Sequence, residues 1–258
     1  MDDIVTDHLS YSRLRSFQIC SLKYFFIYVE KVKPAFTPGA LAFGTAFHRV
    51  VEEALVRKMA GENPAIENLM TVFGKSLDKS QEQAPIRWSE KETRASVMAQ
   101  AQGMIQSWIS WGRPEARIVG VEEGFELELA SWLPKLQGRV DFVEVQEDAV
   151  VLGDIKTSRT HWGDEQILQG QDQLVLYREG LRGLIEEIGK PVKLVWEIIG
   201  KVKTPWIERV VLPEPLPTTE RPIRIASIVL EAIEKRVFLP HPGWQCLSCP
   251  FRGPCREW

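Results

Sequence analysis

The chain has 258 residues, of which 44% are hydrophobic, so it can bury a substantial core as one large domain or two small ones. Its formal net charge of −3 excludes a globally basic nucleic-acid-binding protein, so any such binding must come from a local patch. No stretch approaches the roughly 18 apolar residues of a membrane span, and the N-terminus lacks the features of a signal peptide. We therefore expect a cytoplasmic protein with no membrane contact.

The N-terminal segment has the pattern of a short helix followed by aromatic residues. Ser10 or Ser12 is predicted to cap a helix that runs to Cys20. The segment 11–36 is a local basic patch with interleaved aromatic residues, which indicates contact with DNA. A solvated amphipathic helix with a buried aromatic side would have the same composition. The segment contains one acidic residue, Glu30, and five basic residues: Arg13, Arg15, Lys23, Lys31 and Lys33.

Three longer helices are expected after a linker rich in proline and glycine. The first covers 41–61, has apolar residues near helical spacing, and ends at Gly61 and Pro64. The other two are predicted over 65–80 and 90–112.

Beyond Pro114 the period of the apolar residues changes to that of strands. Strands are expected over 117–129, 136–146, 149–157, 192–200 and 204–212. Helices are predicted over 164–188 and 218–237, whereas the tail from His241 has too many turn formers and cysteines for regular structure. This order predicts one α/β domain with a mixed central sheet, flanking helices and a helical insertion.

Two acidic residues and a lysine occupy adjacent predicted strands. Asp154 and Lys156 are two apart, so their side chains project from the same face while Ile155 points to the core. Asp141 stands six residues before Glu147, and Asp154 stands six residues after Asp148. If the strands pair through the turn between Glu147 and Asp148, the two carboxylates come close together.

This group of side chains favours metal-assisted hydrolysis of a phosphodiester. Carboxylate oxygens are the ligands that Mg²⁺ and Mn²⁺ prefer. The metal polarises the phosphoryl oxygen and lowers the pKa of a bound water, and the lysine orients that water or stabilises charge on the phosphate. The alternative is an ordinary Asp–Lys ion pair on an exposed strand face.

Other candidate residues carry weaker signals on their own. His48 lies in the middle of a predicted helix, where a histidine is more often structural than a ligand. Gln173 and Tyr177 are four apart and share one helix face. In the loop after the lysine, Arg159 could meet a phosphate and Trp162 could stack on an unpaired base, although core packing is the commoner role of a tryptophan.

Four cysteines complete the candidates. Cys20 stands alone near the N-terminus, and the others form the terminal pattern Cys246-x2-Cys249-x5-Cys255. In a reducing compartment such residues are more often metal ligands than disulfides. Four thiolates can hold one zinc ion or one iron–sulfur cluster, and the spacing is compatible with both. Either would join the two ends of the chain.

Taken together and in this order, these segments resemble the RecB-like branch of the PD-(D/E)XK nuclease superfamily. Within that branch they look like the iron–sulfur members, namely the AddB nuclease domain and the CRISPR-associated nucleases of the Cas-four type. The matching segments are LSYSRLRSFQICSLKYFF, FGTAFHRVVEEAL, GRVDFVEV, GDIKT, QLVLY and CLSCPFRGPC. Two departures stand out: Ser21 replaces the proline that often follows the first cysteine, and the helical stretch 61–115 matches no motif.

The resemblance implies a role for each candidate residue. The implied ligands of Mg²⁺ or Mn²⁺ are His48, Asp141, Asp154 and the Ile155 carbonyl. The implied catalytic residues are Asp141, Asp154, Lys156, Gln173 and Tyr177. The implied ligands of a 4Fe-4S cluster, or of zinc as the alternative, are Cys20, Cys246, Cys249 and Cys255. The expected DNA contacts, chosen from their charge or aromatic character and their position, are Arg13, Arg15, Lys23, Arg159 and Trp162.

The resemblance also implies an activity, partners and an organisation. The expected activity is a metal-dependent deoxyribonuclease, an exonuclease on single-stranded or frayed DNA ends in recombination, repair, CRISPR adaptation or phage DNA processing. The expected partners are DNA and either a helicase or CRISPR adaptation proteins. The alternative is a non-catalytic DNA-binding or assembly subunit that keeps the nuclease fold. The expected single domain over 1–258 divides into an N-terminal segment (1–36), a helical region (39–115), a catalytic sheet core (116–212) and a C-terminal helix with a cysteine-cluster tail (213–258).

Overall fold

The computed structural model describes residues 8–112 and 116–258. The expectation that the chain starts without a signal peptide rests on residues 1–7, which lie outside these ranges, as does the end of the helical region at 113–115. None of the helices within these ranges combines the length and the apolar character that a membrane crossing requires.

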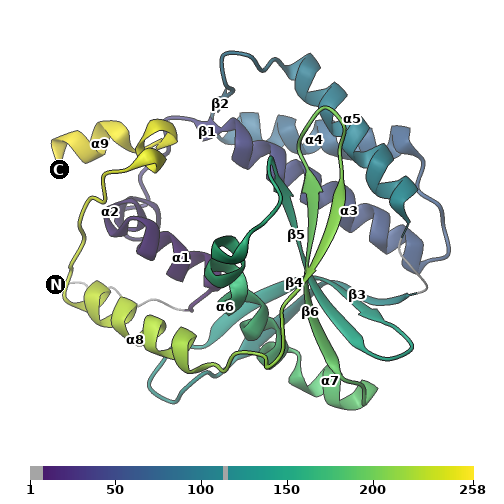
Figure 1. Ribbon diagram of the computed structural model, residues 1–258. Helices are drawn as coiled ribbons and strands as arrows, with labels where there is room; N and C mark the ends of the chain where they lie inside the picture. Colours follow the sequence, from purple (N-terminus) through teal and green to yellow (C-terminus); the bar gives the residue numbers. More distant parts are fainter. Residues whose placement is uncertain (1–7, 113–115) are drawn as a thin grey trace.

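A five-stranded mixed sheet forms the centre of the described part of the chain (Figure 1). In spatial order its strands are β3 (Arg117–Leu127), β4 (Leu136–Val145), β5 (Val150–Ser158), β6 (Val192–Gly200) and β7 (Ile207–Val211). All neighbours are antiparallel except β5 and β6, which are parallel. A parallel pair needs a long crossover, which α6 (Asp164–Gly180) and α7 (Arg182–Ile188) provide. This architecture confirms the predicted α/β fold with a mixed sheet flanked by helices.

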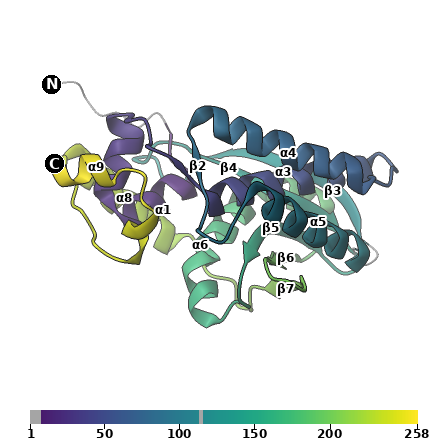
Figure 2. The ribbon, with the colours of Figure 1, turned by 90° about the horizontal axis from the view of Figure 1, so that it is seen from above.

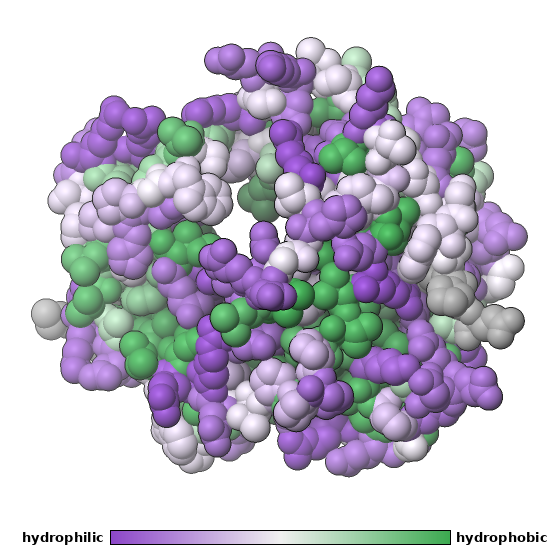
Figure 3. Space-filling model, viewed as in Figure 1, coloured by the Kyte–Doolittle hydropathy of each residue, from purple (hydrophilic) through white to green (hydrophobic). Residues whose placement is uncertain are grey.

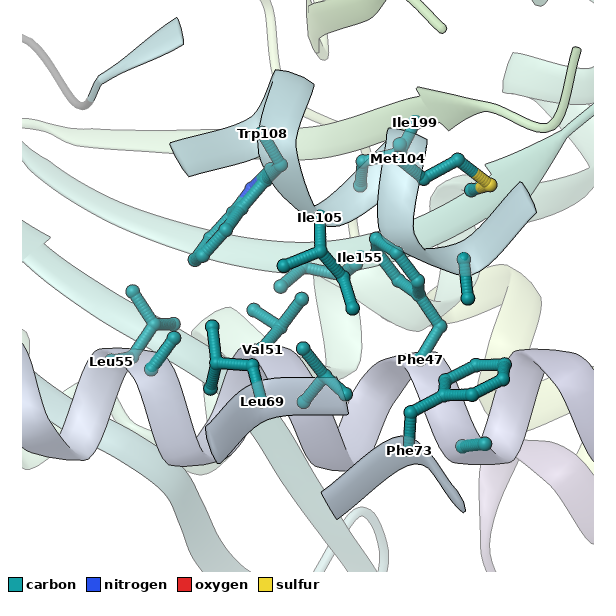
Figure 4. Close-up of a cluster of buried hydrophobic side chains, with 14 of the residues drawn as sticks. Phe47, Val51, Leu55, Leu69, Phe73, Met104, Ile105, Trp108, Ile155 and Ile199 are labelled. Atoms are coloured by element: carbon teal, nitrogen blue, oxygen red, sulfur yellow. The ribbon is translucent and has the colours of Figure 1, made fainter. Parts of the chain in front are cut away.

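One face of the sheet is covered by α3 (Gly39–Met59), α4 (Ile66–Gln83) and α5 (Arg94–Trp111). Figure 4 shows apolar side chains from these helices meeting Ile155 of β5 and Ile199 of β6. Burying each large apolar side chain contributes roughly 1.5–3 kcal/mol, so this core holds α3 firmly against the sheet. It therefore fixes the position of His48, which α3 carries.

The other face of the sheet is covered by α6, where Leu174 packs in a cluster with Leu152 of β5 and Trp196 of β6. Side chains alternate along a strand, so Leu152, Asp154 and Lys156 share this face while Ile155 is buried against α3–α5. The two polar side chains of β5 therefore project toward α6.

The two ends of the chain form a third cluster beside the sheet (Figures 1 and 2). The N-terminal elements are α1 (Tyr11–Ile19), α2 (Ser21–Tyr24) and a π-helix (Phe25–Val29). They pack against α8 (Glu220–Glu234) and a tail that holds a 3-10 helix (Trp244–Ser248) and α9 (Arg252–Glu257). The backbone N–H of Leu22 donates to the carbonyl of Leu239 at 3.1 Å, so the ends are also joined by the main chain.

Three details of the predicted elements are wrong. The tail from His241 is not irregular, because it contains the 3-10 helix and α9. The helix expected over 164–188 is divided at Leu181, next to Gly180, whose missing side chain leaves room for the Phe125 ring; a Cβ there would lie 2.2 Å from that ring. The linker before α3 contains a short strand, β1 (Thr37–Pro38), which pairs in parallel with β2 (Ile86–Arg87).

Candidate active site

The end of the β4–β5 ladder brings Asp141 and Asp154 together. The two strands pair as far as Phe142 and Gly153, and the same register sets Asp141 opposite Asp154. There the Asp141 carboxylate continues the ladder, because its Oδ2 accepts a hydrogen bond from the Ile155 N–H at 2.6 Å. The Phe142 ring covers Gly153, where a Cβ would lie 1.8 Å from it, so the position before Asp154 requires glycine.

Asp141 also faces α3, from which His48 Nδ1 approaches its Oδ2 to 3.4 Å. Burial, followed by the charge of Asp154, raises the pKa of Asp141 from 3.8 to about 8. Burial lowers the pKa of His48 below its ordinary 6.5, which favours the neutral imidazole that binds metals. Near neutral pH the pair is therefore a protonated acid beside a neutral imidazole, and a bound cation would displace the acid proton.

Asp154 is almost fully buried, with 1% of its surface exposed, and α6 supplies hydrogen bonds to it. Its Oδ1 accepts from Gln173 Nε2 at 2.8 Å and from Tyr177 Oη at 3.1 Å. Gln173 Nε2 also lies 2.6 Å from Tyr177 Oη. Gln173 and Tyr177 are one helical turn apart, so α6 presents both to the same carboxylate oxygen. Burial raises the pKa of Tyr177 well above 10, which keeps the phenol a donor.

The second oxygen of Asp154 is suited to a cation. Among the described residues, its one polar contact is the Lys156 ammonium, whose Nζ lies 2.6 Å from Oδ2. Burial lowers the pKa of Lys156, but the charge and hydrogen bond of Asp154, together with the charges of Asp141 and Tyr11, raise it by more, so the ammonium stays protonated. Lys156 Nζ also donates to Gln173 Oε1 at 3.3 Å. Hard carboxylate oxygens beside a neutral imidazole fit Mg²⁺ or Mn²⁺.

Among the described residues, no group of three or more His, Cys, Asp or Glu side chains is already arranged to hold a metal ion. Both candidate carboxylates are already engaged: Oδ2 of Asp141 holds the Ile155 N–H, and Oδ2 of Asp154 faces the Lys156 ammonium. A cation would therefore have to loosen these contacts in order to draw the two carboxylates together.

A groove of about 320 Å³ joins the candidate lysine to the basic N-terminal segment. Lys156 and Gln173 line it on one side, and α1 and α2 contribute Tyr11, Arg15 and Lys23. Tyr11 and Arg15 are one helical turn apart, so α1 presents both on the same face. Two of the expected DNA contacts, Arg15 and Lys23, thus share a groove with the candidate catalytic lysine.

The other expected DNA contacts, which do not line this groove, are held by partners of their own. The Arg13 guanidinium lies 5.1 Å from the centroid of the Tyr28 ring. Arg159 stands in an exposed loop after β5, and its guanidinium forms an ion pair at 3.3 Å with a glutamate that precedes α5. Trp162 is half-buried and packs against Trp196, with 5.5 Å between ring centroids.

Two residues near the site received no role from sequence reasoning, although Tyr11 lies within one of the matching segments. Tyr11 Oη donates to the Gln169 carbonyl of α6 at 3.1 Å, and the charge of Lys156 acts on it. Glu122 of β3 has a left-handed φ of 52°, and its charge contributes to the raised pKa of Asp141. The four-residue spacing from Arg15 could have identified Tyr11. No local signal exists for Glu122, because strand pairing brings it to the site.

The four cysteines line a second pocket, of about 80 Å³. All four are half-buried free thiols. Burial, followed by the charges of the other three, raises the pKa of Cys255, so the four share one neighbourhood. The Sγ atoms of Cys20 and Cys246 each lie 3.9 Å from a backbone carbonyl, the geometry of a weak S–H hydrogen bond. Four such thiols, once deprotonated, are the donors that zinc and iron–sulfur clusters use.

The fold agrees with what comparisons with known proteins found. No curated protein matches the chain. A crystal structure from Eubacterium rectale, of a protein described as a candidate exonuclease, is similar with a TM-score of 0.56 and 14% identity over 97% of this chain and 88% of that chain. At that identity the likeness shows the fold alone. The structure of SSO0001 aligns over 95% of each chain at 16% identity, but its TM-score of 0.38 is too low to support an argument.

A family model extends this likeness to the sequence itself. The model of the PD-(D/E)XK nuclease superfamily matches residues 8–256, which is nearly the whole chain. The match includes both strands of the candidate site, the α3 and α6 helices that complete it, and all four cysteines. The chain therefore belongs to the PD-(D/E)XK nuclease superfamily.

Proposed function

We propose that this protein is a deoxyribonuclease that hydrolyses phosphodiester bonds with the help of Mg²⁺ or Mn²⁺. The observation that carries the proposal is the environment of Asp154. Oδ1 of this buried carboxylate accepts hydrogen bonds from Gln173 and Tyr177, and Oδ2 contacts the Lys156 ammonium. Lys156 and Gln173 also line the groove beside it. A merely structural Asp–Lys pair would not need Gln173 and Tyr177 to fix the carboxylate, or a groove that leads to the lysine.

Each side chain of the site has a proposed part in the reaction. The groups that would hold the cation are Asp154 Oδ2, the Asp141 carboxylate, His48 and the Ile155 carbonyl. The cation supplies Lewis-acid activation of the phosphoryl oxygen and of a water. Gln173 and Tyr177 fix the orientation of the Asp154 carboxylate. Lys156 keeps a positive charge at the edge of the groove, where it can orient the attacking water or neutralise charge that develops on the phosphate.

The proposed substrate is a single-stranded or frayed DNA end, cut by exonuclease action. Support comes from the groove along α1, which brings two basic side chains to the candidate lysine, and from the likeness to a solved protein described as a candidate exonuclease. The resemblance to AddB and to the Cas-four type supports a role in recombination, repair, CRISPR adaptation or phage DNA processing. A helicase or CRISPR adaptation proteins are the proposed partners.

We also propose that the thiol pocket holds a 4Fe-4S cluster rather than zinc. Support comes from the four cysteines that line one pocket and from the resemblance to the iron–sulfur members of the family. The cluster would hold the two ends of the chain together, because metal-binding free energy becomes folding free energy in such sites. Metal analysis of protein purified without oxygen tests this: about four irons per chain are expected, and one zinc without iron contradicts it.

Cleavage of a labelled single-stranded oligonucleotide by the full-length protein with Mn²⁺ tests the nuclease proposal. Asp154→Asn should abolish cleavage, and Lys156→Ala should lose roughly 10²-fold or more in rate, as for removal of one electrostatic stabiliser. Asp148→Asn is the matched control, because that exposed carboxylate lies at the other end of the same strand pair and contacts Lys193. Full cleavage by Asp154→Asn would refute the assignment, and an inactive wild type that still binds DNA would favour the non-catalytic subunit.

A further inference from the structure

The C-terminal tail exposes large apolar side chains. Trp244 is 84% exposed, Leu247 is 72% exposed and Trp258 is 59% exposed. Leaving such surface in water forgoes the free energy of burial, and exposed aromatic residues that gather on one segment mark a binding surface. The motifs of the sequence and the proposed cluster account for the cysteines of this tail but not for its tryptophans.

The backbone that carries Trp244 is held in place by hydrogen bonds. The Cys246 N–H donates to the Gly243 carbonyl at 3.1 Å, and Gln245 Nε2 donates to the His241 carbonyl at 2.7 Å. From outside the tail, the Arg87 guanidinium donates to the Leu247 carbonyl at 3.2 Å. An aromatic ring displayed on an anchored segment is preorganised, so a ligand would bind it at a low cost in ordering.

Lys23 connects this tail to the candidate active site. It lines the groove that holds Lys156 and Gln173, and it also lines the thiol pocket beside Gln245 and Cys246. Figure 3 shows a deep hollow where Figure 1 places the space between the tail and α2 on one side and β5 on the other. A nucleic-acid strand held at Lys156 and running along α1 would therefore reach Lys23, which lies near Gln245, the residue next to Trp244.

We propose that Trp244 is a stacking site for an unpaired DNA base, on the strand that passes through the candidate active site. This inference rests on the proposed function and names a second contact with the same substrate. Aromatic stacking accepts any base, and it works together with positive charge that follows the backbone. The tail supplies that charge through the exposed Arg252 and Arg256, against the single acid Glu257. Lys23 supplies more, so the surroundings suit a polyanion.

Binding of a labelled oligonucleotide without divalent cation tests the proposal, because cleavage is then absent. The oligonucleotide should exceed the roughly 4–16 nucleotides that one single-strand site covers. Trp244→Ala should raise its Kd by roughly 5- to 150-fold, the range that corresponds to losing one stacked base. Trp244→Phe should restore most of the affinity. Trp132→Ala is the matched control: Trp132 is 70% exposed, but its Nε1 lies 3.3 Å from Ser227 Oγ of α8, and its loss should leave the Kd unchanged.

A small phosphodiester distinguishes stacking from damage to the fold. Hydrolysis of the p-nitrophenyl ester of thymidine 5′-phosphate should be unchanged in Trp244→Ala, because this substrate is too short to reach the tail. Asp154→Asn should lose that hydrolysis but bind the oligonucleotide with an unchanged Kd. The two measurements therefore distinguish a failure of the nuclease proposal from a failure of the stacking proposal. An unchanged Kd in Trp244→Ala would overturn the inference. If the wild type self-associates and Trp244→Ala does not, with the Kd unchanged, the tail belongs to a protein contact and the inference is likewise overturned.

Discussion

The electrostatics of one residue, Asp141, predict how metal binding depends on pH. The pKa of its carboxyl is about 8 in the folded protein against an ordinary value of 3.8, first because of burial and then because of Asp154. The folded state therefore holds this proton more tightly than the unfolded state. Its contribution to stability is complete below about pH 4 and is lost as the pH rises through about 8. A cation needs the carboxylate and must displace the same proton.

Stabilisation by Mg²⁺ should therefore grow between pH 6.5 and 8.5, on either side of the folded pKa of about 8. His48 does not mask the effect, because a pKa below its ordinary 6.5 leaves it mainly neutral across that interval. Thermal unfolding with and without Mg²⁺ at several pH values measures the growth. Asp141→Asn is the control and should remove the pH dependence. A shift in Tm that is the same at every pH in the wild type would contradict the assignment of Asp141 as a ligand.

At this scale, local sequence patterns predict part of the site. The Asp141–Asp154 juxtaposition follows from counting, because a short turn and an alternating pattern leave the register little freedom. The Gln173–Tyr177 pair follows from helical spacing, and both reach one oxygen of Asp154. Glu122 could not be foreseen, because its position depends on the pairing of β3 with β4 and on a left-handed φ that no local residue type requires.

Among the elements, a buried charge cluster joins three strands. The Arg209 guanidinium of β7 lies 2.9 Å from Glu144 of β4 and 2.9 Å from Glu197 of β6, and both carboxylates are fully buried. Trp108 of α5 donates to Glu197 at 2.6 Å, so the cluster also ties α5 to the sheet. Removing one member of a buried ion cluster is costly, because the remaining charges lose a partner without regaining water.

Arg209→Met should therefore lower the free energy of unfolding by on the order of 3 kcal/mol, measured by urea denaturation. Arg182→Met is the matched control: Arg182 pairs with Glu179 at an exposed position of α7 and should change stability by about 0.5 kcal/mol or less. Equal effects of the two substitutions would show that the buried cluster contributes no more than a surface pair.

The packing of the elements also explains which of them the sequence predicts correctly. Most helices and strands follow from their period alone, because one face of each must be apolar. The division of the 164–188 helix depends on Phe125, which reaches Gly180 from a distant strand. The π-helix at Phe25–Val29 and the helices of the tail depend on packing between the two chain ends. Contacts of this kind leave no local pattern.

For the whole molecule, the cysteine pocket lies where the two ends of the chain meet. Cys20 follows α1, which lines the groove, and the other three cysteines lie in the tail. The main-chain bond between Leu22 and Leu239 and the Ser21 Oγ contact with the Leu239 N–H at 2.8 Å hold the ends only locally. A bound cluster would add its metal-binding free energy to this junction.

Cys20→Ser should consequently destabilise both ends together and leave the α3–α5 core intact. The cluster-loaded wild type should have a higher Tm than Cys20→Ser, by about 2–4 °C for each kcal/mol that the cluster contributes. The cluster-free wild type is the matched control, and it should unfold at the same temperature as the variant. Hydrogen exchange should show α1, α2 and the tail losing protection in Cys20→Ser, because the junction that holds them has lost a ligand. Loss of protection confined to the tail would mean that Cys20 does not share a cluster with the other three cysteines. The groove along α1 would then owe its shape to the apolar packing of Leu14, Leu22 and Phe26 against α8 and the tail.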